Sequence, residues 1–395
     1  MKATDYLLNQ KLYNMRVLFI VQGEGRGHMT QALAMEQMLH RAGHEVVAII
    51  VGTSKRREVP AYFKTRAKAR LYSIQSPNFY YDGQSRSINL RKTIIYNLLA
   101  LPKYVRELKK IHKLIKAAQP HTVINFYDLM GGAYFALFNP AVKRISSAHQ
   151  YLARHPSFPF ANDSLLQKRL FQLTNFATSI NSHSTIALSF RDYPVAKGGF
   201  TVAPPLLRRE IFEQKPHTGD YLLAYVVNKG YAQDLMQWHN QNKKVKIHCF
   251  WDNKDHGDEW SPRPGLTFHY INDRKFLTLM AGCMGYVSTA GFESICEAMY
   301  LGKPVMMVPV AQQYEQACNA LDAARAGAGI SSVKFDLGPF LNYLSTSRVE
   351  HNSFKAWVAL YESILLKEVE GFIPDTRRKG FKLRFTLPKL SINNR

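Results

Sequence analysis

Three glycines and a histidine stand close together near the start of the chain. The segment LFIVQGEGRGHMTQALAM is an apolar run, then a turn with Gly23, Gly25 and Gly27, then His28 at the start of a helical pattern. Glycine lets the backbone approach a ligand closely, and an imidazole titrates near neutral pH, which suits a general base. The spacing therefore predicts a base presented at a strand-to-helix turn. A glycine-rich turn alone is a weak indication of dinucleotide binding, and GEGRGH lacks the G-x-G-x-x-G spacing of hydride-cofactor sites.

A second stretch, residues 288–330, combines groups that suit a nucleotide sugar. A strand ends at Ser288 and a helix begins near Gly291, where free N–H groups and the positive end of the helix dipole form an anion site for a diphosphate. Glu297 lies two turns into this helix, where a carboxylate can accept both hydroxyls of a ribose. Glu315 and Gln316 open the next predicted helix and offer the paired donors and acceptors that a hexose needs. Taken alone, Glu297 is better explained as a solvated side chain, and Glu315 and Gln316 as a helix-opening pair.

Alternating strand and helix patterns position both stretches. An apolar run at 17–22 predicts a strand buried on both faces, a helix follows over about 29–42, and strands recur at 121–127 and 143–148. A second such series starts near residue 221. Strands separated by helices predict right-handed crossovers and parallel, doubly wound sheets. We expect an α/β protein with two Rossmann-like domains that face each other across a cleft at the carboxyl ends of their strands.

Prolines and polar residues after the first series indicate a linker. The resulting division places an N-terminal extension at 1–15, a first domain at 16–205, the linker at 206–218, a second domain at 219–370 and a basic tail at 371–395.

The chain has a strong excess of basic groups. Over 395 residues, 52 Lys and Arg against 29 Asp and Glu give a net charge of +23, which favours an anionic partner such as nucleic acid, a phospholipid surface or a phosphorylated substrate.

Four scattered cysteines without a CxxC pair argue against a zinc ribbon or a disulfide framework and for a reducing compartment. The first residues are too polar for a signal peptide, and no run approaches the roughly 18 apolar residues that span a bilayer. We expect a cytoplasmic protein, peripheral on the inner face of the cell membrane where it contacts a membrane at all.

The stretch 288–330 resembles the donor-nucleotide motif of two-domain GT-B glycosyltransferases, above all the UDP-glycosyltransferases, the peptidoglycan N-acetylglucosaminyltransferase and the monogalactosyldiacylglycerol synthases. In UDP-glycosyltransferases the motif runs Gly, Ser, Glu-Ala, Gly-x-Pro, a second Pro, an acidic-Gln pair and Asn-Ala. The matching positions are Gly291, Ser294, Glu297, Ala298, Gly302, Pro304, Pro309, Glu315, Gln316, Asn319 and Ala320. The segment GEGRGHMTQAL is similar to the first glycine-rich loop of the same enzymes, so the resemblance covers roughly residues 16–330.

On the acceptor side, the resemblance implies roles for five residues of the first domain. His28 would be the general base, with Gly25 and Gly27 lining the acceptor side of the cleft. Asp128 follows a strand at the position of the aspartate that orients the base in plant UDP-glycosyltransferases, although a helix-capping role fits it equally well. His149 follows another strand end and would also line the acceptor side.

On the donor side, the resemblance implies a nucleotide-sugar site in the second domain. The residues are Thr289, Ala290, Gly291, Ser294, Glu297, Glu315 and Gln316, with Lys229 supplying charge to the phosphates. Thr289 stands where most UDP-glycosyltransferases have His, and Glu293 where they have Asn. A carboxylate at Glu293 would repel a diphosphate unless it points away or caps the helix. We expect no cofactor and no metal, because no DxD pair stands out at a strand end.

The expected activity is an inverting transfer of a hexose or N-acetylhexosamine from a UDP-sugar to an acceptor hydroxyl. A UDP-sugar 2-epimerase uses the same scaffold and remains an alternative, which requires additional acidic groups in the cleft and no acceptor surface. A non-catalytic basic module that binds nucleic acid would explain the net charge of +23. It would not explain the ordered motif, and no RNA-binding signature is present, so we expect no nucleic-acid partner.

Basic residues concentrate in segments 54–70, 91–117 and 377–390, each studded with apolar or aromatic residues. The second segment has a stripe at helical spacing formed by Tyr104, Leu108, Ile111 and Ile115. A basic amphipathic helix can lie on an anionic membrane. The alternative is a domain helix whose stripe packs in the core. Because relatives that glycosylate lipids dock on membranes, we expect a lipid-linked or membrane-associated acceptor.

Overall fold

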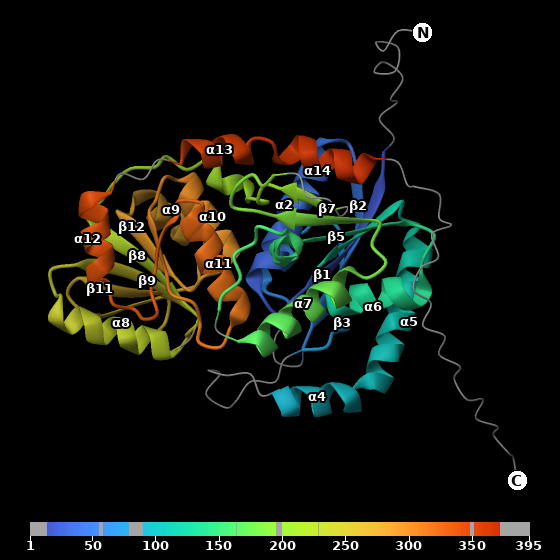
Figure 1. Cartoon of the computed structure of the whole chain (residues 1–395), viewed down its shortest axis with the longest axis horizontal. Helices are drawn as coiled ribbons and strands as arrows, with labels where there is room; N and C mark the ends of the chain where they lie inside the picture. The colour runs from blue at the N-terminus through green and yellow to red at the C-terminus, as the bar shows by residue number, and fades with distance from the viewer. Residues whose placement is uncertain are drawn as a thin grey trace, which may run out of the picture.

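The computed structural model describes residues 14–54, 58–78, 90–162, 164–194, 200–227, 229–347 and 351–371. They form two seven-stranded sheets flanked by helices, one in each half of the chain (Figure 1). The predicted α/β class and the two doubly wound domains are confirmed. Most of the predicted N-terminal extension and basic tail lies outside the described residues.

The sheet of the first domain is entirely parallel, in the order β3-β2-β1-β4-β5-β6-β7. Its strands are β1 (Arg16–Gln22), β2 (Glu45–Thr53), β3 (Arg70–Gln75), β4 (Thr122–Phe126), β5 (Lys143–Ala148), β6 (Ser184–Leu188) and β7 (Phe200–Ala203). Its helices are α2 (Arg26–Arg41), α3 (Ala61–Arg66), α4 (Leu90–Leu99), α5 (Leu101–Ala118), α6 (Leu129–Phe138), the 3-10 helix η1 (His149–Arg154) and α7 (Leu165–Ser179).

Helices cover both faces of this sheet. Along β1, Val17, Phe19 and Val21 belong to a core cluster with α2, whereas Leu18 and Ile20 belong to another with α5 and α6. Successive side chains of a strand point to opposite faces. The near-continuous apolar sequence of β1 is therefore the consequence of burial on both sides.

The apolar stripe of α5 packs inward. Tyr104, Leu108, Ile111 and Ile115 are all buried in the cluster that α5 shares with β1 and α6. The core alternative for this stripe is thus correct, and a membrane-facing role for these four residues is excluded. The exposed apolar side chains of α4 and α5 are different ones, and they are considered below.

The second sheet has the order β10-β11-β9-β8-β12-β13-β14, with β10 antiparallel to β11 and the other pairs parallel. Its strands are β8 (Tyr221–Val226), β9 (Lys246–Trp251), β10 (Glu259–Arg263), β11 (Leu266–Tyr270), β12 (Gly285–Ser288), β13 (Val305–Met307) and β14 (Gly329–Ser331). The helices are α8 (Lys229–Gln241), α9 (Asp273–Gly282), α10 (Phe292–Tyr300), α11 (Tyr314–Arg325) and α12 (Gly338–Thr346). A short 3-10 helix, η2 (Arg209–Ile211), lies within the predicted linker.

The chain crosses back to the first domain at its end. Helices α13 (Asn352–Val358) and α14 (Tyr361–Glu370) run along one side of both domains (Figure 1). His44 Nε2 contacts Glu370 Oε1 at 2.8 Å, and Lys143 Nζ donates to the carbonyl oxygens of Val369 and Gly371. A lysine on the last carbonyls of a helix satisfies groups that the helix itself leaves unpaired. Part of the predicted interval 219–370 therefore packs on the first domain. No described helix is long and apolar enough to cross a bilayer.

Candidate functional site

Two helix N-termini meet where the domains face each other. Helix α2 follows β1 through Gly25, helix α10 follows β12 through Gly291, and neither cap residue gives its helix a side-chain hydrogen bond in the described structure. A Cβ added to Gly27 would lie 3.4 Å from Cγ of Glu293, so the two first turns approach closely. Uncapped first turns leave N–H groups and the positive dipole end available to an anion.

The glycines of the first loop have different functions. Gly23 is required by packing, since a Cβ there would lie 2.7 Å from the carbonyl oxygen of Gly52 on β2. A Cβ at Gly25 would meet no atom within 4 Å. A ligand therefore has space to approach the backbone at Gly25, whereas Gly23 is needed for the close packing of its backbone against β2.

His28 lies between the domains and is almost fully buried. Its Nδ1 is 3.2 Å from Gln31 Oε1, and its Nε2 is 3.3 Å from Gln150 Nε2. Its ring stacks on Tyr127, with centroids 5.5 Å apart. Burial lowers the pKa of His28 to about 4, against a weaker opposing effect of the Gln31 hydrogen bond. The imidazole is therefore neutral at neutral pH, as a general base must be.

Tyr127 has a strained backbone, with a φ of 60°. A bulky residue in the left-handed region costs roughly 1–3 kcal/mol, and such strain concentrates at functional sites. Here it accompanies the stacking of the Tyr127 ring on His28. The strained position thus belongs to the surroundings of His28.

Two carboxyl groups of the second domain reach this histidine through amides. Gln31 Nε2 donates to Glu293 Oε1 at 2.6 Å, and Gln150 Nε2 donates to Glu315 Oε1 at 2.8 Å. Burial raises the pKa of Glu293 to about 8 and that of Glu315 to about 7. A continuous chain of side chains therefore joins the domains with His28 at its centre.

Asp128 takes the capping role. Its Oδ1 accepts from the backbone N–H of Met130 at 2.8 Å and of Gly131 at 3.4 Å, at the start of α6. Burial raises its pKa to about 6. Because both ring nitrogens of His28 contact glutamines, the structure does not bring Asp128 to the position of an orienting carboxylate.

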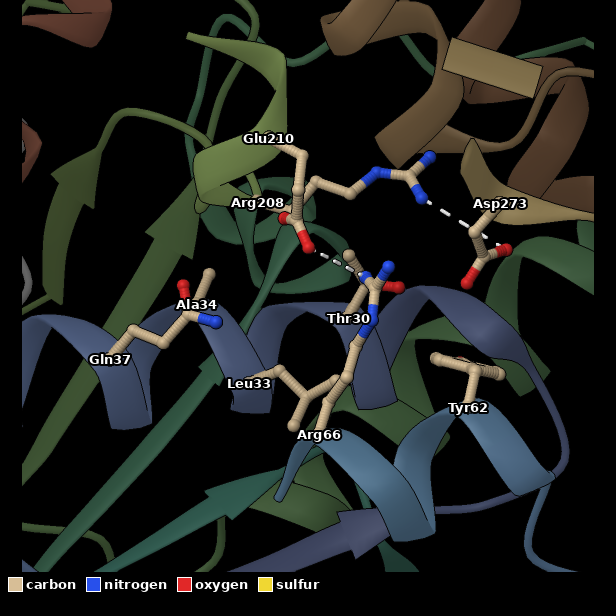
Figure 2. Close-up of a pocket in the computed structure, with 9 residues that line it drawn as sticks. All are labelled: Thr30, Leu33, Ala34, Gln37, Tyr62, Arg66, Arg208, Glu210 and Asp273. Carbon is tan, nitrogen blue, oxygen red and sulfur yellow. Dashed lines mark ion pairs between the residues drawn. The ribbon is translucent and has the colours of Figure 1, made fainter. Parts of the chain in front are cut away.

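Glu297, which is expected to bind the ribose, forms a bidentate ion pair with Arg208 of the linker. Arg208 Nε donates to its Oε1 at 2.5 Å and Arg208 Nη2 to its Oε2 at 2.8 Å. Arg208 also lies 4.0 Å from Asp273, which Arg26 contacts at 3.2 Å. Figure 2 shows Arg208 extending toward Asp273 from the linker, above helix α2.

The other predicted donor residues lie around the start of α10 and α11. Thr289 and Ala290 are buried in the connection from β12, and Gly291 is the N-cap of α10. Ser294 lies in the first turn of α10, and Gln316 Oε1 accepts from the backbone N–H of Val310 at 2.9 Å. Lys229 is the first residue of α8, and its side chain lies outside the described structure.

His149 joins the domains by stacking. Its ring lies on Phe292 with centroids 4.0 Å apart and an interplanar angle of 17°, and its Nδ1 contacts the carbonyl oxygen of Leu188 at 2.8 Å. Burial lowers its pKa to about 4. The structure thus places His149 at the boundary with the second domain, beside the first turn of α10.

Sequence reasoning missed Gln31, Gln150 and Arg208. Gln31 follows His28 by three residues, which puts both on one face of a helix, and that spacing was a usable signal. Gln150 and Arg208 contact residues far away in the sequence, and only the arrangement of the domains reveals them. The described residues contain no group of three or more His, Cys, Asp or Glu side chains arranged to hold a metal.

The family model described as glycosyl transferase family 1 matches residues 15–345, which include His28 and the whole donor motif. The chain belongs to this family. A curated relative, the UDP-N-acetylglucosamine--N-acetylmuramyl-(pentapeptide) pyrophosphoryl-undecaprenol N-acetylglucosamine transferase of Porphyromonas gingivalis, is 24% identical over 347 residues, covering 82% of this chain and 84% of the relative.

Solved structures agree on the fold. The glycosyltransferase of kitacinnamycin superposes with a TM-score of 0.62 at 14% identity, over 91% of this chain and 98% of that one. Acinetobacter baumannii MurG superposes with a TM-score of 0.54 at 14% identity, over 91% of this chain and 100% of that one. These neighbours are GT-B glycosyltransferases, and the fold of the present glycosyltransferase is GT-B.

Proposed function

We propose that this glycosyltransferase moves a hexose or N-acetylhexosamine from a UDP-sugar to an acceptor hydroxyl, with inversion at the anomeric carbon. The observation that supports this most directly is the approach of two uncapped helix N-termini with the neutral His28 between the domains. The first domain supplies a base for the acceptor hydroxyl, and the second supplies an anion site for the departing diphosphate. A direct displacement requires both groups.

In the proposed reaction, His28 Nε2 removes the proton of the acceptor hydroxyl while its oxygen attacks the anomeric carbon. The bond from that carbon to the diphosphate oxygen breaks, and UDP leaves with the electron pair. The positive end of α10 stabilises the charge that develops on the diphosphate. Because Gln150 Nε2 lies 3.3 Å from His28 Nε2, the acceptor hydroxyl has to take the position of this amide.

The sugar would lie among the buried polar groups between the domains. Glu315 and Gln150 are hydrogen-bonded to each other there. Among the described residues, Gln150 Oε1 and Glu293 Oε2 are buried without a hydrogen-bond partner. Buried polar atoms without partners are costly in a folded protein, and sugar hydroxyls would satisfy both.

We further propose a lipid-linked or membrane-associated acceptor. A cavity of about 220 Å³ lies at the carboxyl ends of β2 and β3, and its lining includes the polar Thr53 and Ser76 and the apolar or aromatic Leu99 and Tyr96. Lys103 also lines it. A polar group with an attached apolar chain suits such a mixed lining.

Helices α4 to α7, of which α4 and α5 line this cavity, expose apolar side chains among basic ones. Those at least 47% exposed on α4 to α7 are Ile95, Leu98, Leu99, Leu101, Val105, Leu137, Leu165, Leu166, Leu173 and Phe176. Within these four described helices, Glu107 is the one acidic residue, and α5 alone has six lysines or arginines. A mixed basic and apolar surface suits an anionic bilayer, and this supports a peripheral position on the cytoplasmic face of a membrane.

A UDP-sugar 2-epimerase is the second candidate, because one observation favours it. Acid–base chemistry on a sugar needs carboxyl groups in the cleft, and Glu293 and Glu315 are buried there with pKa values raised to about 8 and about 7. Carboxyls that titrate near neutral pH are candidates for proton transfer.

Incubation with radiolabelled UDP-sugars and extracted membrane lipids separates the two. We expect label in the lipid fraction, and at least a 100-fold loss of transfer in His28→Ala, the lower bound for a general base. Isomerised free nucleotide sugar, without lipid labelling, would instead establish the epimerase. Full transfer by His28→Ala would remove this residue from the mechanism.

A further inference from the structure

We propose that Gln31 is a positioning residue that fixes the tautomer of His28 and ties it, through Glu293, to the donor domain. The inference rests on the proposed function, since it assigns to a neutral amide the orienting task that a carboxylate has in related enzymes. Gln31 does not touch substrate in this proposal and acts through His28.

The direction of each hydrogen bond is determined by the groups present. An amide NH₂ can only donate, and an amide oxygen can only accept. Gln150 Nε2 lies 3.3 Å from His28 Nε2, so that ring nitrogen accepts with its lone pair and carries no proton. The proton of the neutral imidazole is therefore on Nδ1, and Nδ1 donates to Gln31 Oε1 across 3.2 Å.

The other end of Gln31 is equally engaged. Its Nε2 donates to Glu293 Oε1 at 2.6 Å, and in this orientation the amide oxygen faces His28 Nδ1. Gln31 is only 2% exposed, and a buried donor or acceptor left unpaired costs about 1–3 kcal/mol. Glu293 thus holds Gln31 with its oxygen toward His28, and Gln31 accepts the Nδ1 proton in the tautomer that leaves Nε2 as the basic nitrogen.

Asp128, the carboxylate that the family resemblance suggests for orienting His28, forms its hydrogen bonds with another part of the chain. Asp128 caps α6 through Met130 and Gly131. Besides Gln31 and Gln150, the ring of His28 contacts Tyr127 by stacking, and the titratable groups one residue further away are Glu293, Glu315 and His149. Of the described side chains, Gln31 is the one in contact with Nδ1.

The contact has a consequence for closure of the cleft. Glu293 lies in the first turn of α10, in the second domain, and Gln31 lies on α2, in the first. If the domains separate, Gln31 loses the partner that sets its orientation. The hydrogen bond that orients Gln31 is therefore present only while the first turn of α10 is next to His28.

Histidine NMR on the full chain tests the tautomer without any substrate. With ¹⁵N-labelled histidine, and the signal of His28 assigned by its absence in His28→Ala, we expect a neutral ring protonated at Nδ1. In Gln31→Met, which keeps the approximate volume and removes both hydrogen bonds, the proton should move to Nε2 in at least part of the molecules. Protonation at Nε2 in the unchanged protein, or an unaltered spectrum in Gln31→Met, would overturn the proposal.

Kinetics then test the connection to Glu293. Gln31→Met should lower kcat by roughly 10-fold or more, a fraction of the full contribution of a general base, with the KM for the donor changed less than about twofold. The matched control is Gln37→Met, on the same helix but outside these contacts.

In the double variant Gln31→Glu with Glu293→Gln, the carboxylate and the amide exchange places and the chain of hydrogen bonds is retained.

The exchange should recover most of the lost kcat. Because a carboxylate at Nδ1 favours the charged imidazole, it should also move the acidic limb of the pH–rate profile to higher pH. Failure of the transfer assay with every substrate would count against the proposed function alone, since the NMR result stands without turnover.

Discussion

The ion pair between Arg208 and Glu297 leads to a prediction about nucleotide binding. Both side chains are nearly buried, with 13% and 3% of their surface exposed. If Glu297 accepts the ribose hydroxyls, as the family resemblance implies, the arginine has to release it when the donor binds. Arg208→Met removes the competing partner and keeps most of the apolar stem.

Two effects of opposite sign follow from this substitution. Without nucleotide, Glu297 is left buried and unpaired, and removal of one partner from a buried pair costs about 3–5 kcal/mol of folding stability. With UDP, the ribose hydroxyls satisfy the free carboxylate, and no ion pair has to break first. A relief of about 1–3 kcal/mol corresponds to roughly 5-fold to 150-fold tighter binding of UDP.

Calorimetric titration with UDP and urea unfolding measure the two effects separately. The control is Arg209→Met, since Arg209 is 69% exposed and, among the described residues, pairs with Glu213, which is 60% exposed. Surface pairs of this kind contribute about 0–1 kcal/mol, so stability and UDP affinity should barely change. Weaker UDP binding in Arg208→Met would show that the arginine itself contacts the nucleotide and would refute the competition.

Three further changes have defined outcomes. The raised pKa of Glu293, about 8 when folded against about 4.5 when unfolded, stabilises the fold at low pH and loses this effect as pH rises through 8. Urea unfolding of Glu293→Gln should therefore depend less on pH between 5 and 8, and an unchanged slope would contradict the burial effect. Asp128→Ala should cost about 1–2 kcal/mol in thermal unfolding through loss of the helix cap, while Asp128→Asn should keep full transfer; a 100-fold loss of transfer would restore Asp128 as the orienting group. Leu98→Asp with Leu99→Asp should lower co-sedimentation with anionic vesicles several-fold, whereas Val333→Asp, at a position 94% exposed in the other domain, should not.

The fold was predictable because its signals are local. The apolar run of β1, the interruption after residue 205 and the repeated strand and helix patterns each depend on neighbouring residues. The position of α14 was not predictable from such patterns, because its contacts with His44 and Lys143 join residues more than 200 positions apart. A boundary drawn from composition cannot detect a helix that returns to the other domain.

The candidate site was predictable only in its residue types. The family resemblance singled out His28 and Glu297, and both lie where the two domains meet. Their partners come from other parts of the chain: Gln150 from the first domain and Arg208 from the linker. A carboxylate that the family resemblance assigns to ligand hydroxyls can form an ion pair with another side chain of the protein when no ligand is bound. The spacing of residues in the sequence does not indicate that ion pair.

Glu293 shows how the structure resolves a difficulty in the sequence. Where related enzymes have Asn, a carboxylate in the first turn of α10 seemed incompatible with a diphosphate. The side chain turns toward Gln31 at 2.6 Å, and burial raises its pKa to about 8. At neutral pH the group is mostly protonated and uncharged, so it adds little repulsion to the positive end of the helix. Glu293 can therefore hold Gln31 in place and leave the field of α10 available to an anion.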